Sequence, residues 1–295
     1  MDERYDMVRT VSDGRYIYLR QYMPHKIYGQ HVSYMFETQT TQVWKRMFDE
    51  GRLNVAQSRF WETKPPEELY DLDNDPDEID NLADSPVHQQ ILQRLRQVQQ
   101  DWVFQSRDFG FLPEAEIHSR SRNSTPYEVE QDDEQYPLGR IVRTADLAAS
   151  LDPDAVDELI AALADADSAV RYWAVLGLLM RQAPAVNTAR EYLLDALSDP
   201  SASVRVTAAE ALGRYGSGPD IDTALEVLLE HAVVQVNGEF IAMLAVAALD
   251  AMDERALGVQ DRIVAIDTTG GTGTRPTVRE VERLIAKTLA DLGER

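Results

Sequence analysis

The sequence has 295 residues, enough for two domains of ordinary size, and its 44% hydrophobic and 27% charged residues are typical of a globular protein. Acidic residues outnumber basic ones by 51 to 29, and the formal net charge of −22 disfavours binding to nucleic-acid phosphates over a broad surface. The lack of cysteine excludes disulfides, thiolate metal sites and cysteine nucleophiles, and no apolar run is long enough for a transmembrane helix.

The first hundred residues mix strand and helix patterns. Two β-prone runs, 8–11 and 16–19, flank Ser12-Asp13-Gly14-Arg15. An Asp-Gly pair in that place predicts a β-hairpin, because both residues tolerate a positive φ. A third strand is expected over residues 68–72, and a helix over 34–50 that ends at a glycine.

A second helix is expected after Asp75-Pro76-Asp77-Glu78, where Asp75 would cap it and Pro76 would fit its first turn. Its apolar residues recur at helical spacing. The residues predicted for its buried face are Ile91, Leu95, Val98 and Trp102. The aromatic residues predicted for the core of this part are Tyr5, Tyr16, Tyr18, Trp44, Phe48, Trp61, Trp102 and Phe104.

Residues 119–141 are rich in Ser, Arg, Asn and Pro and then acidic, which predicts a loosely packed or disordered linker. Beyond them the pattern is helical and repeats. The turns Asp165-Ala166-Asp167-Ser168 and Asp199-Pro200-Ser201-Ala202 are 34 residues apart, and each leads into a helix. A helix–turn–helix unit of this length resembles HEAT repeats.

A third, degenerate repeat is expected over residues 223–252, followed by a Gly/Thr-rich loop over 268–274 and a closing helix over 276–292. Arg171 and Arg205 occupy matching positions after the acidic turns. We expect them to pair with the preceding Asp residues, within or between repeats.

One string of residues is similar to the C-terminal signature of type I sulfatases of the alkaline-phosphatase-like superfamily, in particular to the N-sulphoglucosamine sulphohydrolase-like group. It comprises Lys64-Pro65-Pro66-Glu67-Glu68-Leu69-Tyr70-Asp71-Leu72, Asp75-Pro76-Asp77-Glu78 and Asn81-Leu82-Ala83. Taken by themselves, these residues are expected to build a strand, an acidic turn and a capped helix. Their role in this chain is therefore predicted to be structural.

The resemblance extends over roughly residues 1–118. Flanking segments also fit it: Asp2-Glu3-Arg4-Tyr5-Asp6-Met7-Val8-Arg9, Gly14-Arg15-Tyr16-Ile17-Tyr18, Gly51-Arg52-Leu53 and Phe109-Gly110-Phe111-Leu112-Pro113-Glu114. Because family-like sequence begins at Asp2, we expect the natural chain to continue upstream. No secretory signal is expected at Met1, since no apolar stretch follows it, and the compartment stays open.

Sulfatases of this kind use a formylglycine nucleophile, made from Cys or Ser in a C/S-x-P-S/A-R motif, and a Ca²⁺ ion. The string Ser124-Thr125-Pro126-Tyr127-Glu128 begins like that motif but has Tyr and Glu where Ser or Ala and Arg are required. Asp71, Asp73 and Asp75 alternate as in an EF-hand, but the required Gly and Glu are missing. No catalytic residue, metal ligand or cofactor is therefore assigned to this chain.

The segment His25-Lys26-Ile27-Tyr28-Gly29-Gln30-His31 places cationic groups beside aromatic rings in a very acidic chain. Such groups suit a sulfated sugar, and the resemblance implies that this loop lies near the substrate cleft. His25, Lys26 and His31 are therefore candidate substrate contacts. The alternative is a packed loop with exposed histidines, and His-x5-His alone does not indicate a metal site.

The sequence thus predicts an α+β fold, with a small antiparallel sheet and helices followed by an all-α HEAT-like solenoid. Its expected domains are a sulfatase C-terminal subdomain (1–118), an acidic linker (119–141) and helical repeats (142–295). The first hypothesis is the C-terminal portion of a hydrolase of sulfate esters or N-sulfates on glycans, inactive without its upstream catalytic region. The second is a non-catalytic interaction module whose solenoid binds a protein partner.

Overall fold

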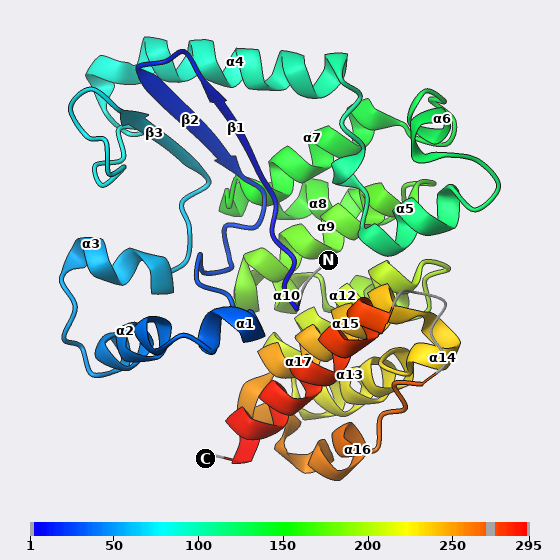
Figure 1. Ribbon diagram of the computed structural model, residues 1–295. Helices are drawn as coiled ribbons and strands as arrows, with labels where there is room; N and C mark the ends of the chain where they lie inside the picture. Colours follow the sequence, from blue (N-terminus) through cyan, green and yellow to red (C-terminus); the bar gives the residue numbers. More distant parts are fainter. Residues whose placement is uncertain (1–2, 270–274, 294–295) are drawn as a thin grey trace. The chain divides into compact units, whose positions relative to one another are not determined.

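The computed structural model describes residues 3–269 and 275–293 and separates the chain into two compact units, whose elements are labelled in Figure 1. The N-terminal unit comprises residues 6–108, and the repeat unit comprises residues 109–295 together with 1–5. Over the described residues the chain is mostly helical, with one small three-stranded antiparallel sheet. None of its helices within those ranges has the length and apolar character needed to span a bilayer. Residues 109–141, predicted as the end of one domain and a linker, belong to the repeat unit.

The N-terminal unit contains the sheet and the helices that pack around it. Its elements are β1 (Val8–Ser12), β2 (Tyr16–Gln21), α1 (Ser33–Phe36), α2 (Gln39–Asp49), α3 (Val55–Ser58), η1 (Arg59–Trp61), β3 (Glu67–Asp71), η2 (Pro86–His88) and α4 (Gln89–Gln105).

The predicted hairpin is confirmed. Strand β1 pairs with β2 from Val8↔Gln21 onward, and β2 pairs in turn with β3. In the turn Gly14 has a φ of 99°, a conformation that favours glycine, and the Asp13 carboxylate accepts hydrogen bonds from the amides of residues 15 and 16 at 3.0 and 2.8 Å.

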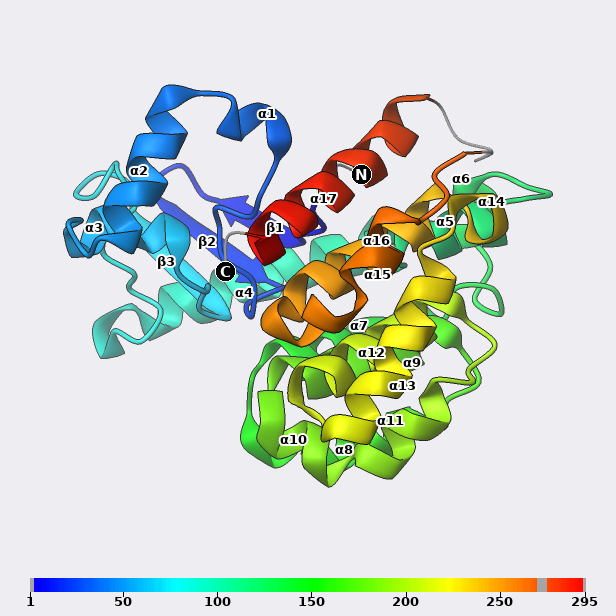
Figure 2. The same cartoon turned by 90° about the horizontal axis from the view of Figure 1, so that it is seen from below.

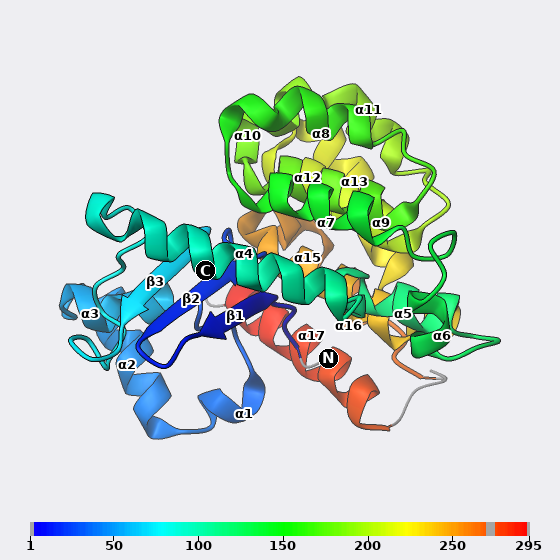
Figure 3. The same ribbon diagram turned by 90° about the horizontal axis from the view of Figure 1, so that it is seen from above.

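Helix α4 packs across the sheet, as the views in Figures 1 and 3 show, and Leu92 and Leu95 join a core with Tyr18 and Leu69. The buried face of α4 differs from the predicted one, because the residues it buries are Leu92, Leu95, Gln99 and Val103. Trp102 is 53% exposed and Phe104 47%, so their assignment to the core is wrong. The polar Gln99 interrupts the row of apolar residues on the buried face. The predicted row of apolar residues beside it therefore fits the helical spacing equally well.

Two other helix predictions need correction. The expected helix over 34–50 is broken into α1 and α2, and the side chain of Thr38 caps the second one by accepting from the amide of Thr41. Asp75 does not cap a helix; its carboxylate accepts from the amide of Asp80 at 2.8 Å within a turn where Glu78 has a φ of 54°. A side chain that satisfies a turn amide competes with helix initiation at that place.

The repeat unit is helical throughout its described residues. Its elements are η3 (Phe109–Phe111), α5 (Glu114–Arg120), α6 (Pro126–Glu130), α7 (Leu138–Ala149), η4 (Pro153–Ala155), α8 (Val156–Ala162), α9 (Ser168–Met180), α10 (Gln182–Thr188), α11 (Arg190–Ala196), α12 (Ala202–Tyr215), α13 (Gly218–His231), α14 (Val234–Asn237), α15 (Glu239–Ala251), η5 (Asp253–Val259), α16 (Gln260–Val264) and α17 (Arg275–Gly293).

Helices α7, α9, α12, α15 and α17 pack one against the next and form the inner row of the stack (Figure 2). The third repeat is confirmed by α13 and α15, in which Ala245 and Leu249 are fully buried, and α17 confirms the closing helix. A Cβ at Gly177 would lie 2.8–3.0 Å from atoms of Leu159 and Ala148, so this glycine allows the close approach of α9 to α7. Of the predicted loop 268–274, residues 270–274 lie outside the described residues.

The predicted linker, residues 119–141, carries the end of α5, the whole of α6 and the start of α7 instead of a loosely packed or disordered segment. Thr125 and Glu128 form a capping box at the start of α6. Val129 and Tyr136 are fully buried. These few buried apolar residues lie among short polar runs that dominate the composition of the segment. Composition alone therefore predicts a linker.

Candidate functional site

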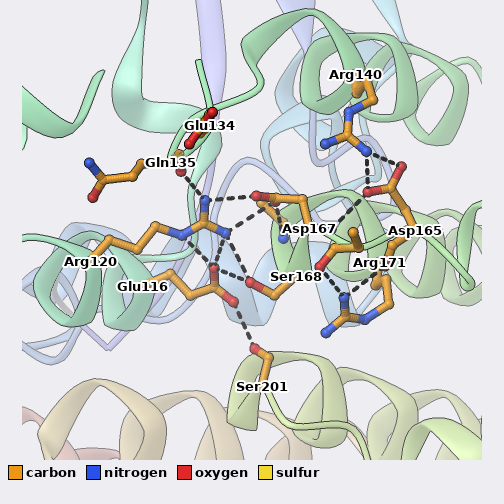
Figure 4. Close-up of polar contacts among 12 residues, drawn as sticks. Glu116, Arg120, Glu134, Gln135, Arg140, Asp165, Asp167, Ser168, Arg171 and Ser201 are labelled. Atoms are coloured by element: carbon orange, nitrogen blue, oxygen red, sulfur yellow. Dashed lines mark hydrogen bonds and ion pairs between the residues drawn. The ribbon is translucent and has the colours of Figure 1, made fainter. Parts of the chain in front are cut away.

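The repeat unit contains a groove of about 1330 Å³ along the turns between its helices. Its lining comes from α5 and the chain after it, from the repeat turns 163–168 and 199–203, and from residues 237–241. Figure 4 shows the polar side chains at its centre. The 34-residue period is what brings equivalent turns of successive repeats together on one face.

The two repeat turns are built in the same way. In the first, the Asp165 carboxylate accepts from the amide of Asp167 at 2.8 Å, and in the second Asp199 accepts from the amide of Ser201 at 2.8 Å. Asp167 also caps α9 by accepting from the amide of Ala169. The Asp side chains therefore stabilise these turns as hydrogen-bond acceptors.

Arg171 links one turn to the next. Its guanidinium donates to Asp199 at 2.6 and 2.8 Å, and one further nitrogen donates to the carbonyl oxygens of Asp165 and Ala166. The Asp199 carboxylate raises the pKa of Arg171. The predicted pairing of Arg171 with the preceding Asp residues is therefore wrong, because its ion pair is with Asp199 in the turn that follows and the preceding turn offers it carbonyl groups.

His231 takes the corresponding place in the third repeat. Arg205 donates from Nε to Nε2 of His231 at 2.9 Å, and His231 Nδ1 donates to the Val227 carbonyl at 2.7 Å, which fits the neutral ring. Burial lowers the pKa of His231, and the positive charge of Arg205 lowers it further. The hydrogen bond to the Val227 carbonyl has the opposite effect and raises this pKa.

Because the folded pKa of His231 lies below the unfolded value, its stabilising effect is complete above about pH 6.5 and is lost as the pH falls. We expect the free energy of unfolding to decrease between about pH 7 and about pH 5, and to decrease less in His231→Gln. Urea denaturation at both pH values measures how much the free energy of unfolding changes with pH in each of the two proteins. Equal pH dependence in the two proteins would contradict this assignment.

An ionic network holds α5 against both repeat turns (Figure 4). Glu116 accepts from Arg120 at 2.7 Å, from Ser168 at 2.7 Å and from Ser201 at 2.7 Å. Arg120 also pairs with Asp167 at 2.9 Å. Burial tends to lower the pKa of Arg120, but Asp167 and Glu116 outweigh it and raise the pKa. Since these groups satisfy one another, the network is a structural clamp at the base of the groove.

Sequence reasoning missed Glu116 and Arg120 because they fall at the boundary between the predicted domain and the predicted linker. The available signal was their spacing: an acid followed four residues later by an arginine favours a helix. The partners of these two residues in the repeat turns are far away in the sequence, so the spacing of residues along the chain does not identify them.

All three candidate substrate residues lie in the segment that follows β2 in the N-terminal unit. Both ring nitrogens of His25 are buried. The His31 ring stacks on Phe36 with a centroid distance of 4.7 Å. Lys26 is half-buried, and its charge adds to the effect of burial in lowering the pKa of the neighbouring Lys64.

The residues of the sulfatase-like string build structure. Glu68 accepts from Gln21 at 2.7 Å and from Tyr70 at 2.6 Å. The carboxylates at the two ends of β3 are also paired, Glu67 with Arg96 at 2.7 Å and Asp71 with Arg15 at 2.6 Å. Asn81 bonds the backbone of β3 at residues 67 and 69.

The cofactors implied by the sulfatase resemblance do not fit these residues. Asp71, which begins the EF-hand-like series, already accepts from Arg15 and from Asn74, and no cluster of three or more metal-ligating side chains occurs in the described chain. Ser124 donates to Glu128 at 2.7 Å in the capping structure of α6. The string Ser198-Asp199-Pro200-Ser201-Ala202 also begins like the formylglycine motif, but it has Ala where Arg is required and forms a repeat turn.

Comparisons with known proteins agree with parts of this picture. A family model of HEAT repeats matches residues 156–250. The Ulvan-active sulfatase of Formosa agariphila is 36% identical over 125 residues, which are 42% of this chain and 21% of that protein. The match thus spans about a fifth of the relative's length. The chain therefore carries HEAT-like repeats and is similar, over part of its length, to a sulfatase.

Proposed function

We propose that these residues form the C-terminal part of a hydrolase that releases sulfate from esters or N-sulfates of a polysaccharide. The similarity to an ulvan-active sulfatase carries the proposal, and the string from Lys64 to Ala83 supports a type I sulfatase of the N-sulphoglucosamine sulphohydrolase-like group. The formylglycine and Ca²⁺ would belong to an upstream catalytic region. This chain would complete the fold and help to hold the glycan.

The loop at residues 25–31 supplies a cation for that purpose. Most cations of the N-terminal unit already have carboxylate partners: Arg9, Arg15, Lys45, Arg52, Lys64, Arg94 and Arg96. Lys26 has no ion pair within the described residues, and it lies close enough to Lys64 to affect the pKa of that group. A sulfate group near Lys26 would gain a charge-assisted hydrogen bond.

The proposal is tested by comparing the protein from the full open reading frame with the 295-residue chain. Sulfate released from ulvan is measured by ion chromatography. We expect release by the longer protein and none by the shorter one, because only the longer one would contain the nucleophile. Release by the 295-residue chain, or by neither protein, would contradict the proposal.

Replacing Lys26 tests its contact with the glycan. In the longer protein we expect Lys26→Gln to raise the KM for the polysaccharide about three- to tenfold with little change in kcat, since the lost contact forms on binding. Lys45→Gln is the matched control, because it removes one positive charge from the same unit at a side chain paired with Asp49. An equal rise in KM for both variants would contradict a specific contact. His25 and His31 stay predictions.

A second function is a protein-interaction module formed by the repeats, and the groove favours it. Solenoid repeats commonly present extended binding surfaces. The groove is charged as well as large, since six carboxylates and three arginines line it. The acidic residues are Glu116, Glu134, Asp165, Asp167, Asp199 and Glu239.

A further inference from the structure

Two residues that line the groove each contain a buried oxygen atom that lacks a hydrogen-bond partner in the described structure. The atoms are Oε2 of Glu239 and Oγ of Ser203. Glu239 is only 4% exposed and Ser203 only 1%. Buried polar atoms in proteins almost always have a partner, so each of these atoms calls for an explanation.

Glu239 differs in this respect from the acids beside it. Within the described residues, four of these acids form ion pairs with arginines. Arg120 pairs with both Glu116 and Asp167, Arg140 pairs with Asp165, and Arg171 pairs with Asp199. Glu134 forms no ion pair with these residues, but its side chain is exposed to water. A carboxylate held away from water without a counter-charge is costly, and that cost is recovered when a cation binds.

Both residues lie at the start of a helix. Gly238, with a φ of 76°, precedes Glu239 as the first residue of α15, and Ser203 lies in the first turn of α12. Next to Glu239, the Phe240 ring stacks on His118 with a centroid distance of 4.4 Å and an interplanar angle of 7°. The two acceptors and this apolar wall belong to the same groove.

We propose that the groove binds a lysine or arginine side chain of a partner protein, whose cationic group donates to Glu239 and Ser203. The surplus of carboxylates attracts a cation, and two acceptor oxygens match a group that has several N–H donors. The groove's volume of about 1330 Å³ suits a segment of peptide rather than a single small amine. The inference rests on the interaction function proposed for the repeats and is independent of sulfate hydrolysis.

The test measures fluorescence anisotropy of a labelled peptide of alternating glycine and lysine, titrated with the 295-residue chain. We expect saturable binding that is weakened about tenfold or more by Glu239→Gln, because this substitution keeps the shape and removes the charge. Glu158→Gln is the matched control, since Glu158 is an exposed acid of the same unit outside the groove. It should change the Kd less than about twofold.

Four results would overturn the inference. Equal weakening by Glu239→Gln and Glu158→Gln would indicate diffuse attraction to an acidic protein, and equally tight binding of spermine or Ca²⁺ would exclude a peptide side chain as the specific ligand. Equally tight binding of a peptide with glutamine in place of lysine would show that the groove does not select a cation. The proposed interaction function of the repeats would not be affected by that result. The thermal midpoint of Glu239→Gln should equal or exceed that of the unchanged protein; a lower midpoint would assign Glu239 a structural role instead.

Discussion

We expect Trp173→Ala to lower the free energy of unfolding of the repeat unit by about 3–5 kcal/mol, the usual cost of removing a large buried aromatic side chain. Trp173 lies in α9 and is fully buried. Its indole N–H donates to the carbonyl oxygen of Phe111 at 2.9 Å, and its ring packs against those of Phe111 and Tyr172. The substitution would therefore leave a cavity and also remove the hydrogen bond to the Phe111 carbonyl group.

Urea denaturation followed by far-UV circular dichroism measures this effect. Trp102→Ala is the matched control, because Trp102 is more than half exposed on α4 and should cost less than about 1 kcal/mol. Trp173→Phe retains much of the apolar area, so its loss of unfolding free energy should lie between those of Trp173→Ala and Trp102→Ala. A cost for Trp173→Ala no greater than that for Trp102→Ala would contradict the role assigned to the indole.

The pair of tryptophans shows how far sequence predicts this fold. Period and turn chemistry located the hairpin and the 34-residue repeat, because both depend on neighbouring residues. The choice of buried face on α4 depends on the sheet it meets, and two apolar series of the same period competed for it. The exposed series predicts Trp102 for the core, although the series containing Leu92 and Val103 is the buried one.

Segment 119–141 shows a second limit. Its composition predicts a linker, whereas Val129 and Tyr136 are fully buried and Arg120 is ion-paired with Asp167 of a repeat turn. The groove could not be predicted at all, because it requires turns from successive repeats and α5 to meet. Even so, the acidic character of those turns was visible in the sequence, and Asp165 and Asp199 line the groove.

We also expect Arg120→Ala to destabilise the repeat unit by about 3–5 kcal/mol, because it removes one partner of a buried ionic network. The side chain of Arg120 is 16% exposed, and those of Glu116 and Asp167 are 9% and 10% exposed. Both carboxylates would keep their burial and lose their counter-charge. Arg122→Ala is the control two residues away, where the side chain is exposed and has no ion pair within the described residues.

The size of the effect depends on the carboxylate left behind, and a double-mutant cycle can show this. In a Glu116→Gln background the same Arg120→Ala change should cost less, since a neutral amide remains where a buried charge would have been stranded. Far-UV circular dichroism in urea gives the four free energies of unfolding. If Arg120→Ala cost as little as Arg122→Ala, or if its cost were the same in both backgrounds, α5 would not be held to the repeat turns by this network.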